Sequence, residues 1–332
     1  MVSTSRRSSS ATTAGKVERL LVGRFHSLGD VVLATGIVGR LAISGTQVEV
    51  ATRSAFVPIF EGLPVTRIWT PEDLGESGDF DRVIDLQSNG TSRRLLARGG
   101  RIGRVDSRSF ARRWTVYWGR RAPRPSILHC VQRYAAAAAC PQELIPALRP
   151  RMVVTEQDAT EGQTLPLAWA RTGSRCVGLA PGASRAMKRW PEDRVRSLAG
   201  ALAAKGYATI RFEEPRDGTC RETHGAVQAT LRPLKALLGR CAALVTNDSG
   251  MMHLAVALGV PVVAIFGSTV LDFGFGPLGD RDRVVERDLA CRPCAPHGAR
   301  FCWQGHAGCL RGVTVEDVLA AVLERTGAEV PR

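Results

Sequence analysis

The 332-residue sequence has no uninterrupted apolar stretch of the roughly 18 residues that a membrane-spanning helix needs. It also lacks the continuous apolar segment of a secretory signal near its start. Residues 1–16 are small and polar instead, and are predicted to be a disordered leader. Together these absences predict a soluble chain, and the expected location is the cytoplasm.

Acidic residues are scarce relative to basic ones. The chain has 31 Asp and Glu against 45 Lys and Arg, which gives a formal charge of +14. Such an excess favours an anionic partner: nucleic acid, acidic lipid headgroups or a phosphorylated substrate. It is concentrated between Arg93 and Arg124, where eleven of 32 residues are arginine. This segment is either a solvated surface or an anion-binding face.

Apolar runs that alternate with helical patterns predict two α/β domains with parallel sheets. A strand at 17–25 precedes a helix that runs from about Asp30 to Ile43, and a second strand follows. The alternation restarts at residue 176 after a proline-rich passage. The predicted domains are therefore residues 17–165 and 172–332. Because ligands bind at the carboxyl ends of such strands, we expect the site between the two domains.

The strongest candidate for an anion site is "LVTNDSGMMHLAVALG". A strand ending at Thr246 runs through Asp248, Ser249 and Gly250 directly into a helix, whose first N–H groups are unpaired and attract phosphate. Ser249 could cap the helix or touch the ligand. His253 lies one turn into the helix on the same side, as either a core histidine or a ligand contact.

A second candidate is "LAPGASRAMKRWPEDR". A strand ends in a Pro-Gly-Ala-Ser loop that contains Ser184, and Lys188 follows before the next helix. A lysine ammonium is a compact charge suited to a diphosphate. From spacing alone, an ordinary loop with a surface lysine fits equally well. Asp30 is similarly ambiguous, since an acid in the first turn of a helix is also a common stabilising feature.

Six segments follow one another over roughly residues 17 to 325: "HSLGDVVLATGIVGRL", "FDRVIDLQSNGTSRRLLA", "RIGRVD", "LAPGASRAMKRWPEDR", "VTNDSGMMHLAVALGVPVVAIFGST" and "CLRGVTVEDVL". In this order they resemble the successive blocks of glycosyltransferase family 9, the ADP-heptose:lipopolysaccharide heptosyltransferases. The resemblance implies a GT-B fold of two Rossmann-like domains, an acceptor-binding N-terminal one and a nucleotide-sugar-binding C-terminal one. It departs from the family at Ser249-Gly250-Met251, where Thr-Gly-Pro or Thr-Gly-Leu is usual.

The resemblance also implies the activity, an inverting transfer of heptose from ADP-heptose to a hydroxyl of an inner-core-like glycolipid, without a catalytic metal. Asp30 would then be the general base. The implied diphosphate contacts are Ser184, Lys188, Asp248, Ser249, Gly250 and His253. Glu213 or Glu214 would hold the ribose. An anionic acceptor at the inner membrane face favours the anion-binding interpretation of the arginine-rich segment, and peripheral contact with the membrane.

Four of the nine cysteines cluster near the end as C-x2-C-x7-C-x6-C: Cys291, Cys294, Cys302 and Cys309. Four thiolates could close a structural zinc or iron site, with His297 or His306 replacing one ligand. The alternative is a packed thiol-rich loop.

Two other functions remain open from the sequence. The same fold could transfer another nucleotide-activated sugar to a secondary metabolite or a protein. From a different class, the chain could bind nucleic acid or an anionic surface with a vestigial nucleotide site. The intact Asp30, Lys188, Asp248 and His253 argue against a vestigial site, so no nucleic-acid partner is expected.

Overall fold

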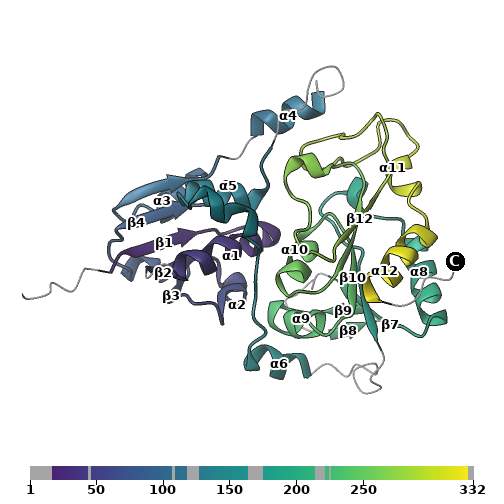
Figure 1. Ribbon diagram of the computed structural model, residues 1–332, viewed down its shortest axis with the longest axis horizontal. Helices are drawn as coiled ribbons and strands as arrows, with labels where there is room; N and C mark the ends of the chain where they lie inside the picture. Colours follow the sequence, from purple (N-terminus) through teal and green to yellow (C-terminus); the bar gives the residue numbers. More distant parts are fainter. Residues whose placement is uncertain are drawn as a thin grey trace, which may run out of the picture.

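The computed structural model describes residues 17–43, 46–106, 109–117, 127–163, 175–213, 221–223 and 226–327. The predicted leader and Glu214 lie outside the described residues. Two α/β domains stand side by side, joined by a segment that descends between them (Figure 1). Within the described part of the chain, no helix is both long and apolar enough to cross a bilayer.

The N-terminal domain is built on a parallel sheet with the strand order β3-β2-β1-β4-β5 among the described residues. Helix α1 (Leu28–Ile43) connects β1 to β2 and is buried along most of its length, because its residues are almost all apolar. The strands are β1 (Arg19–Gly23), β2 (Gln47–Ala51), β3 (Arg67–Trp69), β4 (Arg82–Asp85) and β5 (Arg101–Arg104), and the other helices packed around them are α2 (Val57–Phe60) and α3 (Gly90–Leu95).

The C-terminal domain has a larger sheet with the order β12-β11-β10-β6-β7-β9-β8 in the described ranges, parallel except for the β8–β9 pair. The strands are β6 (Cys176–Ala180), β7 (Ala208–Glu213), β8 (Arg221–Thr223), β9 (Ala226–Gln228), β10 (Ala243–Asn247), β11 (Val262–Phe266) and β12 (Arg283–Glu286). The helices are α8 (Glu192–Ala204), α9 (Leu231–Leu238), α10 (Gly250–Ala257), α11 (Gly308–Arg311) and α12 (Val315–Thr326).

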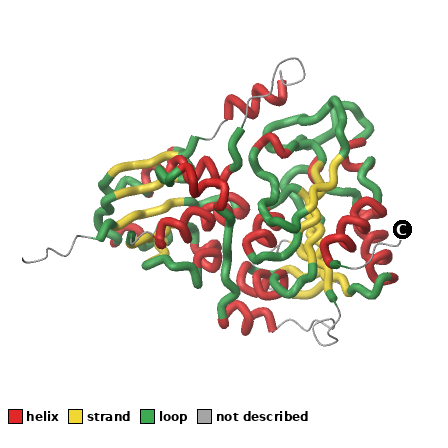
Figure 2. The backbone as a smooth tube through the Cα atoms, viewed as in Figure 1, coloured by secondary structure: helices red, strands yellow, loops and turns green. Residues whose placement is uncertain are grey.

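The central strands of this sheet explain why the sequence shows continuous apolar runs there. Every residue of β6, β10 and β11 is buried, because helices cover both faces of the sheet (Figure 2). The last helix, α12, begins at Thr314, whose hydroxyl accepts from the Asp317 amide while the Asp317 carboxylate accepts from the Thr314 amide. A threonine followed three residues later by an acid is a typical helix start.

Three helices lie between or beside the two sheets: α4 (Ser109–Tyr117), α5 (Cys130–Ala137) and α6 (Glu156–Gln163). Short 3-10 turns occur at Ser54–Phe56, Leu74–Glu76, Gln142–Ala147, Ala186–Lys188 and Leu271–Phe273. The predicted boundary between residues 165 and 172 falls outside the described residues and stays a prediction.

Helix α6 is fixed to the C-terminal domain by a buried ion pair. The Lys235 ammonium of α9 lies 2.6 Å from Asp158 Oδ2, and neither side chain is exposed. The same ammonium donates to the Pro58 carbonyl oxygen at 2.7 Å. One buried lysine therefore joins α6, α9 and helix α2 of the N-terminal domain.

Candidate functional site

The loops that follow β1 and β10 bring the amino ends of α1 and α10 together across the two domains. A Cβ atom added to Gly29 would lie 2.9 Å from His253 Cδ2 and 3.3 Å from Gly250 Cα. One added to Gly250 would lie 3.2 Å from the Gly29 nitrogen. Larger residues would push the helices apart, so glycine at both positions permits this approach. Two positive helix ends thus face the same space.

Asp30 lies in the first turn of α1, and its side chain is 22% exposed. Its Oδ2 atom is held from two sides, because Arg24 Nη2 lies 2.7 Å away and Ser27 Oγ donates to it at 3.0 Å. Its Oδ1 atom has only longer contacts, from Tyr134 OH at 3.3 Å and from Cys130 Sγ at 3.8 Å. One carboxylate oxygen is therefore fixed, while the other is available to a ligand.

The surroundings of Asp30 keep it ionised. Burial alone would raise its pKa, but Arg24, the Ser27 hydroxyl and His253 lower the pKa below its ordinary value. In the opposite direction, burial and the Asp30 charge raise the pKa of Tyr134 well above its ordinary range, and raise that of Cys130 to about 12. Tyr134 and Cys130 are therefore protonated donors that face an anionic carboxylate at neutral pH.

Lys188 and Asp248 form an ion pair opposite Asp30. Lys188 Nζ lies 2.7 Å from Asp248 Oδ2, and the two side chains are 13% and 12% exposed. Thr269 Oγ1 donates to the same carboxylate oxygen at 2.7 Å. Asp248 thus holds the lysine in place, and its predicted contact with the nucleotide stays a prediction.

The loop after β6 is fixed to the end of β10 by Asn247. The Asn247 side chain accepts from the Trp190 amide at 3.0 Å and donates to the Pro181 carbonyl at 2.6 Å. Ser184 lies on this loop and is exposed. Ser249 begins α10 without capping it by its side chain, and its hydroxyl lies 3.3 Å from Thr246 Oγ1. Of its two predicted roles, capping is therefore excluded in this structure.

His253 is buried in the first turns of α10 and faces Gly29. Burial, together with the nearby His129 and Lys188, lowers the pKa of His253 to about 4, although Asp248 and Asp30 oppose the shift. The imidazole is therefore neutral at pH 7 and can donate one N–H, rather than supply a positive charge.

His129, which the sequence did not indicate, caps α5 and contacts the C-terminal domain. Its Nδ1 accepts from the Val131 amide at 3.3 Å, and its Nε2 donates to the Gly276 carbonyl at 3.0 Å. The Cys130 amide donates to the Gly274 carbonyl at 2.8 Å. Phe275 lies between these two glycines in the chain, and the Arg112 guanidinium lies over its ring, 5.0 Å from the ring centre. These three contacts, called the Phe275 clasp below, close one side of the space between the domains.

The cysteine-containing segment covers Lys188. A Cβ atom on Gly298 would lie 2.6 Å from Lys188 Cδ, and the Ala299 carbonyl accepts from the Met187 amide at 3.2 Å. His297, beside this glycine, has a pKa lowered by burial and then by the charges of Arg112 and Lys188, with Asp30 opposing. His297 therefore belongs to the electrostatic surroundings of the site.

The four clustered cysteines are gathered but are not placed as ligands. Burial raises the pKa of Cys309, and the other three thiols, of Cys291, Cys294 and Cys302, raise it further. Cys302 accepts a hydrogen bond from the Ala307 amide at 3.3 Å, which lowers the Cys302 pKa. Within the described ranges, however, no three His, Cys, Asp or Glu side chains are arranged to hold a metal ion. The predicted structural metal site stays a prediction.

Glu213 is the last residue of β7 and lies at the carboxyl edge of the sheet, where the predicted ribose contact requires it. Its Oε1 accepts from Arg211 Nε at 2.8 Å, and Arg211 also pairs with Glu192. Glu213 is therefore held in place at this edge. Whether it or Glu214 holds the ribose stays a prediction.

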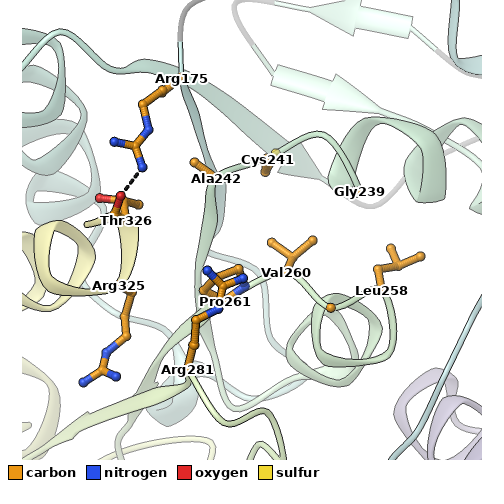
Figure 3. Close-up of a pocket in the computed structure, with 11 residues that line it drawn as sticks. Arg175, Gly239, Cys241, Ala242, Leu258, Val260, Pro261, Arg281, Arg325 and Thr326 are labelled. Carbon is orange, nitrogen blue, oxygen red and sulfur yellow. Dashed lines mark hydrogen bonds between the residues drawn. The ribbon is translucent and has the colours of Figure 1, made fainter. Parts of the chain in front are cut away.

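A separate cavity of about 350 Å³ lies at the opposite edge of the same sheet (Figure 3). Its lining includes Arg175, Ala242 and Pro261, which directly precede β6, β10 and β11. Arg175 donates to the Thr326 carbonyl at the end of α12, and Arg325 pairs with Glu324. Because ligands of such sheets bind at the carboxyl ends of the strands, we do not assign the candidate site to this cavity.

The profile of glycosyltransferase family 9 (heptosyltransferase) matches residues 72–302, more than half of the chain. A lipooligosaccharide heptosyltransferase 2 of Haemophilus influenzae is 32% identical over 179 residues, which are 47% of this chain and 51% of that protein. The chain thus spans about half the length of this curated relative.

Two solved structures show the same fold. The family 9 glycosyltransferase of Veillonella parvula has a TM-score of 0.71 at 19% identity, covering 93% of this chain and 97% of its own. The ADP-heptose lipopolysaccharide heptosyltransferase II of Escherichia coli has a TM-score of 0.68 at 22% identity, covering 93% and 98%. The predicted GT-B fold is confirmed. On the family profile, this chain belongs to glycosyltransferase family 9, the heptosyltransferases.

Proposed function

We propose that this protein transfers heptose from ADP-heptose to a hydroxyl of an anionic saccharide acceptor, with inversion at the sugar carbon. One observation carries the proposal: the carboxylate of Asp30 and the amino end of α10, with Lys188 beside it, face each other across the two domains. Inversion requires a base and a stabiliser of the leaving group on opposite sides of one carbon, and this arrangement supplies both.

In this mechanism Asp30 removes the proton from the acceptor hydroxyl. Its Oδ1 atom is the base, since Arg24 and Ser27 hold Oδ2. A carboxylate with a lowered pKa is a weak base toward an alcohol. It suffices here because the attacking oxygen becomes strongly acidic as its bond to the sugar carbon forms. Arg24 therefore positions the base but also makes it weaker. The weaker base still suffices, because the proton is transferred late, when the acceptor oxygen is already acidic.

On the other side, the departing ADP gains negative charge on its β-phosphate. The amides at the start of α10, which no side chain caps, and the Lys188 ammonium stabilise that charge without reorganising. Asp248 and Thr269 hold the lysine in place. Neutral His253 contributes an N–H donor. Ser184, on the exposed loop after β6, is the remaining proposed phosphate contact.

The acceptor and the cellular location are further parts of the proposal. We propose an anionic inner-core-like glycolipid, reached from the cytoplasmic face of the inner membrane. The net charge of +14 and the eleven arginines between Arg93 and Arg124 support an anionic acceptor.

We further propose that Cys291, Cys294, Cys302 and Cys309 hold a structural zinc or iron ion. Their spacing and their gathering around Cys309 support this. As they lie, the thiols do not form a ligand set, so the ion would require them to move together. We assign it no part in the transfer.

Asp30→Asn is expected to lower the rate of heptose transfer by roughly two or more orders of magnitude, because the amide cannot accept the proton. ADP affinity, measured by calorimetry, should stay the same. Asp193→Asn, at an exposed acid in the first turn of α8, is the matched control and should be near normal. Near-normal transfer by the Asp30 variant would refute its role as base.

Lys188→Ala is expected to weaken ADP binding about tenfold or more while changing AMP binding much less, because the lysine is assigned to the β-phosphate. Calorimetric titrations with both nucleotides measure this. Lys205→Ala removes an exposed lysine of the same domain and should change neither affinity. Equal losses for ADP and AMP would place Lys188 away from the β-phosphate.

The pH dependence of kcat/KM tests the electrostatics of the site. Asp30 has a lowered pKa and His253 one of about 4, so neither changes charge between pH 5 and 8. We expect no acid limb in that range, and activity should fall only as Asp30 is protonated at lower pH. An acid limb centred near the ordinary histidine pKa would contradict this assignment.

Arg24→Gln provides the matched variant for this profile. Loss of the neighbouring cation should raise the Asp30 pKa by about one unit or more, which moves the acid limb upward. A variant that merely folds poorly would lose activity at every pH, and the acid limb of its profile would stay at the same pH.

The metal proposal is tested by elemental analysis of protein purified without chelators. About one equivalent of zinc or iron per chain is expected. Cys291→Ser with Cys294→Ser should remove it, whereas Cys140→Ser, at a cysteine outside the cluster, should not. Metal-free wild-type protein would leave the cluster as a packed thiol-rich loop.

A further inference from the structure

Helix α4 carries exposed aromatic side chains that the candidate site does not use. Phe110 is 77% exposed, Trp114 37% and Tyr117 74%. Steps of four and three residues place the three on one side of a helix, and the Phe110 and Trp114 rings lie 6.2 Å apart. Apolar side chains gathered on a surface in this way indicate a binding site for another molecule or for a membrane.

The opposite side of α4 faces the space between the domains. Arg112 is 6% exposed and Thr115 1%, and the Arg112 guanidinium lies over the Phe275 ring. Phe275 belongs to the clasp that closes one side of the space between the domains, so this side of α4 borders the candidate active site. The three aromatic rings are on the other side of the helix, so they face away from a saccharide held at Asp30.

The charge around this face indicates what the occupant is. Arg113 is exposed on the same side of α4, between Phe110 and Tyr117. From Arg93 to Arg124 the sequence contains eleven arginines and a single acidic residue, Asp106. A helix with aromatic rings on one side and arginines beside them is typical of segments that lie in the headgroup region of anionic bilayers. Figure 1 shows α4 at the outer edge of the molecule, away from both sheets, where a flat surface can approach it.

We propose that this face of α4, made by Phe110, Arg113, Trp114 and Tyr117, binds the surface of an anionic lipid bilayer. The three rings would enter the headgroup region, and the arginines would contact lipid phosphates. The biological role of this binding, though not the binding itself, rests on the proposed function. Because α4 borders the candidate active site, a bound α4 would hold that site close to the membrane that carries a glycolipid acceptor.

Vesicle flotation of the full chain tests the proposal. Binding is expected to vesicles of phosphatidylethanolamine and phosphatidylglycerol, and not to vesicles of phosphatidylcholine alone. Phe110→Ser with Trp114→Ser and Tyr117→Ser should lower partitioning roughly tenfold or more. The triple leucine variant keeps apolar side chains at the same positions and should keep most of the binding. Both triple variants should bind ADP normally by calorimetry, which shows that they are folded.

Three results would overturn the proposal: no flotation of the parent chain with either vesicle, equal flotation of the parent with both, or unchanged binding by the triple serine variant. If that variant instead lost affinity for single-stranded DNA while the parent ignored vesicles, the face would bind nucleic acid. The vesicles contain neither donor nor acceptor, so the result is independent of heptose transfer. A chain that binds vesicles but transfers no sugar would refute only the proposed function.

Discussion

The approach of Gly29 to Gly250 is the constraint on which the site depends. It places the amino ends of two helices from different domains in contact, and a single methyl group at either position would meet the other helix. Each helix end alone is a weak anion site. Together they define a space with a carboxylate on one side and unpaired amides on the other. Neither domain could create this combination by itself.

Around that space, the charged side chains are held in ion pairs. Arg24 holds Asp30, and Asp248 holds Lys188, each through one carboxylate oxygen at 2.7 Å. Burial lowers the pKa values of His129, His253 and His297, so these histidines around the site are neutral at pH 7. A site built in this way presents nearly the same field at every physiological pH, and little needs to reorganise as the leaving group gains charge.

Local pattern predicted much of this structure and missed what depends on distant partners. The strand at 176–180, the helix after Gly250 and the cap at Thr314 follow from periodicity and residue type, and all are present. The edge strands β3 and β8 have only three residues each, too few for a period to be recognised. Local pattern left the role of Asp30 open and the family resemblance singled it out, but Tyr134 approaches it from a helix about a hundred residues later. The neutrality of His253 depends on burial, which no local pattern encodes.

The buried Lys235 has a mechanical consequence. It ties α9 to the Pro58 carbonyl, while Gly29 and Gly250 touch farther along the same boundary. A further contact, the Phe275 clasp, joins the domains beside α4 through two hydrogen bonds to carbonyl oxygens and a guanidinium over the ring. Both the Lys235 contact and the clasp use backbone carbonyl oxygens on one partner. Substitution of that partner's side chain would leave these acceptors in place, so the two domains are joined by groups that are present whatever residue carries them.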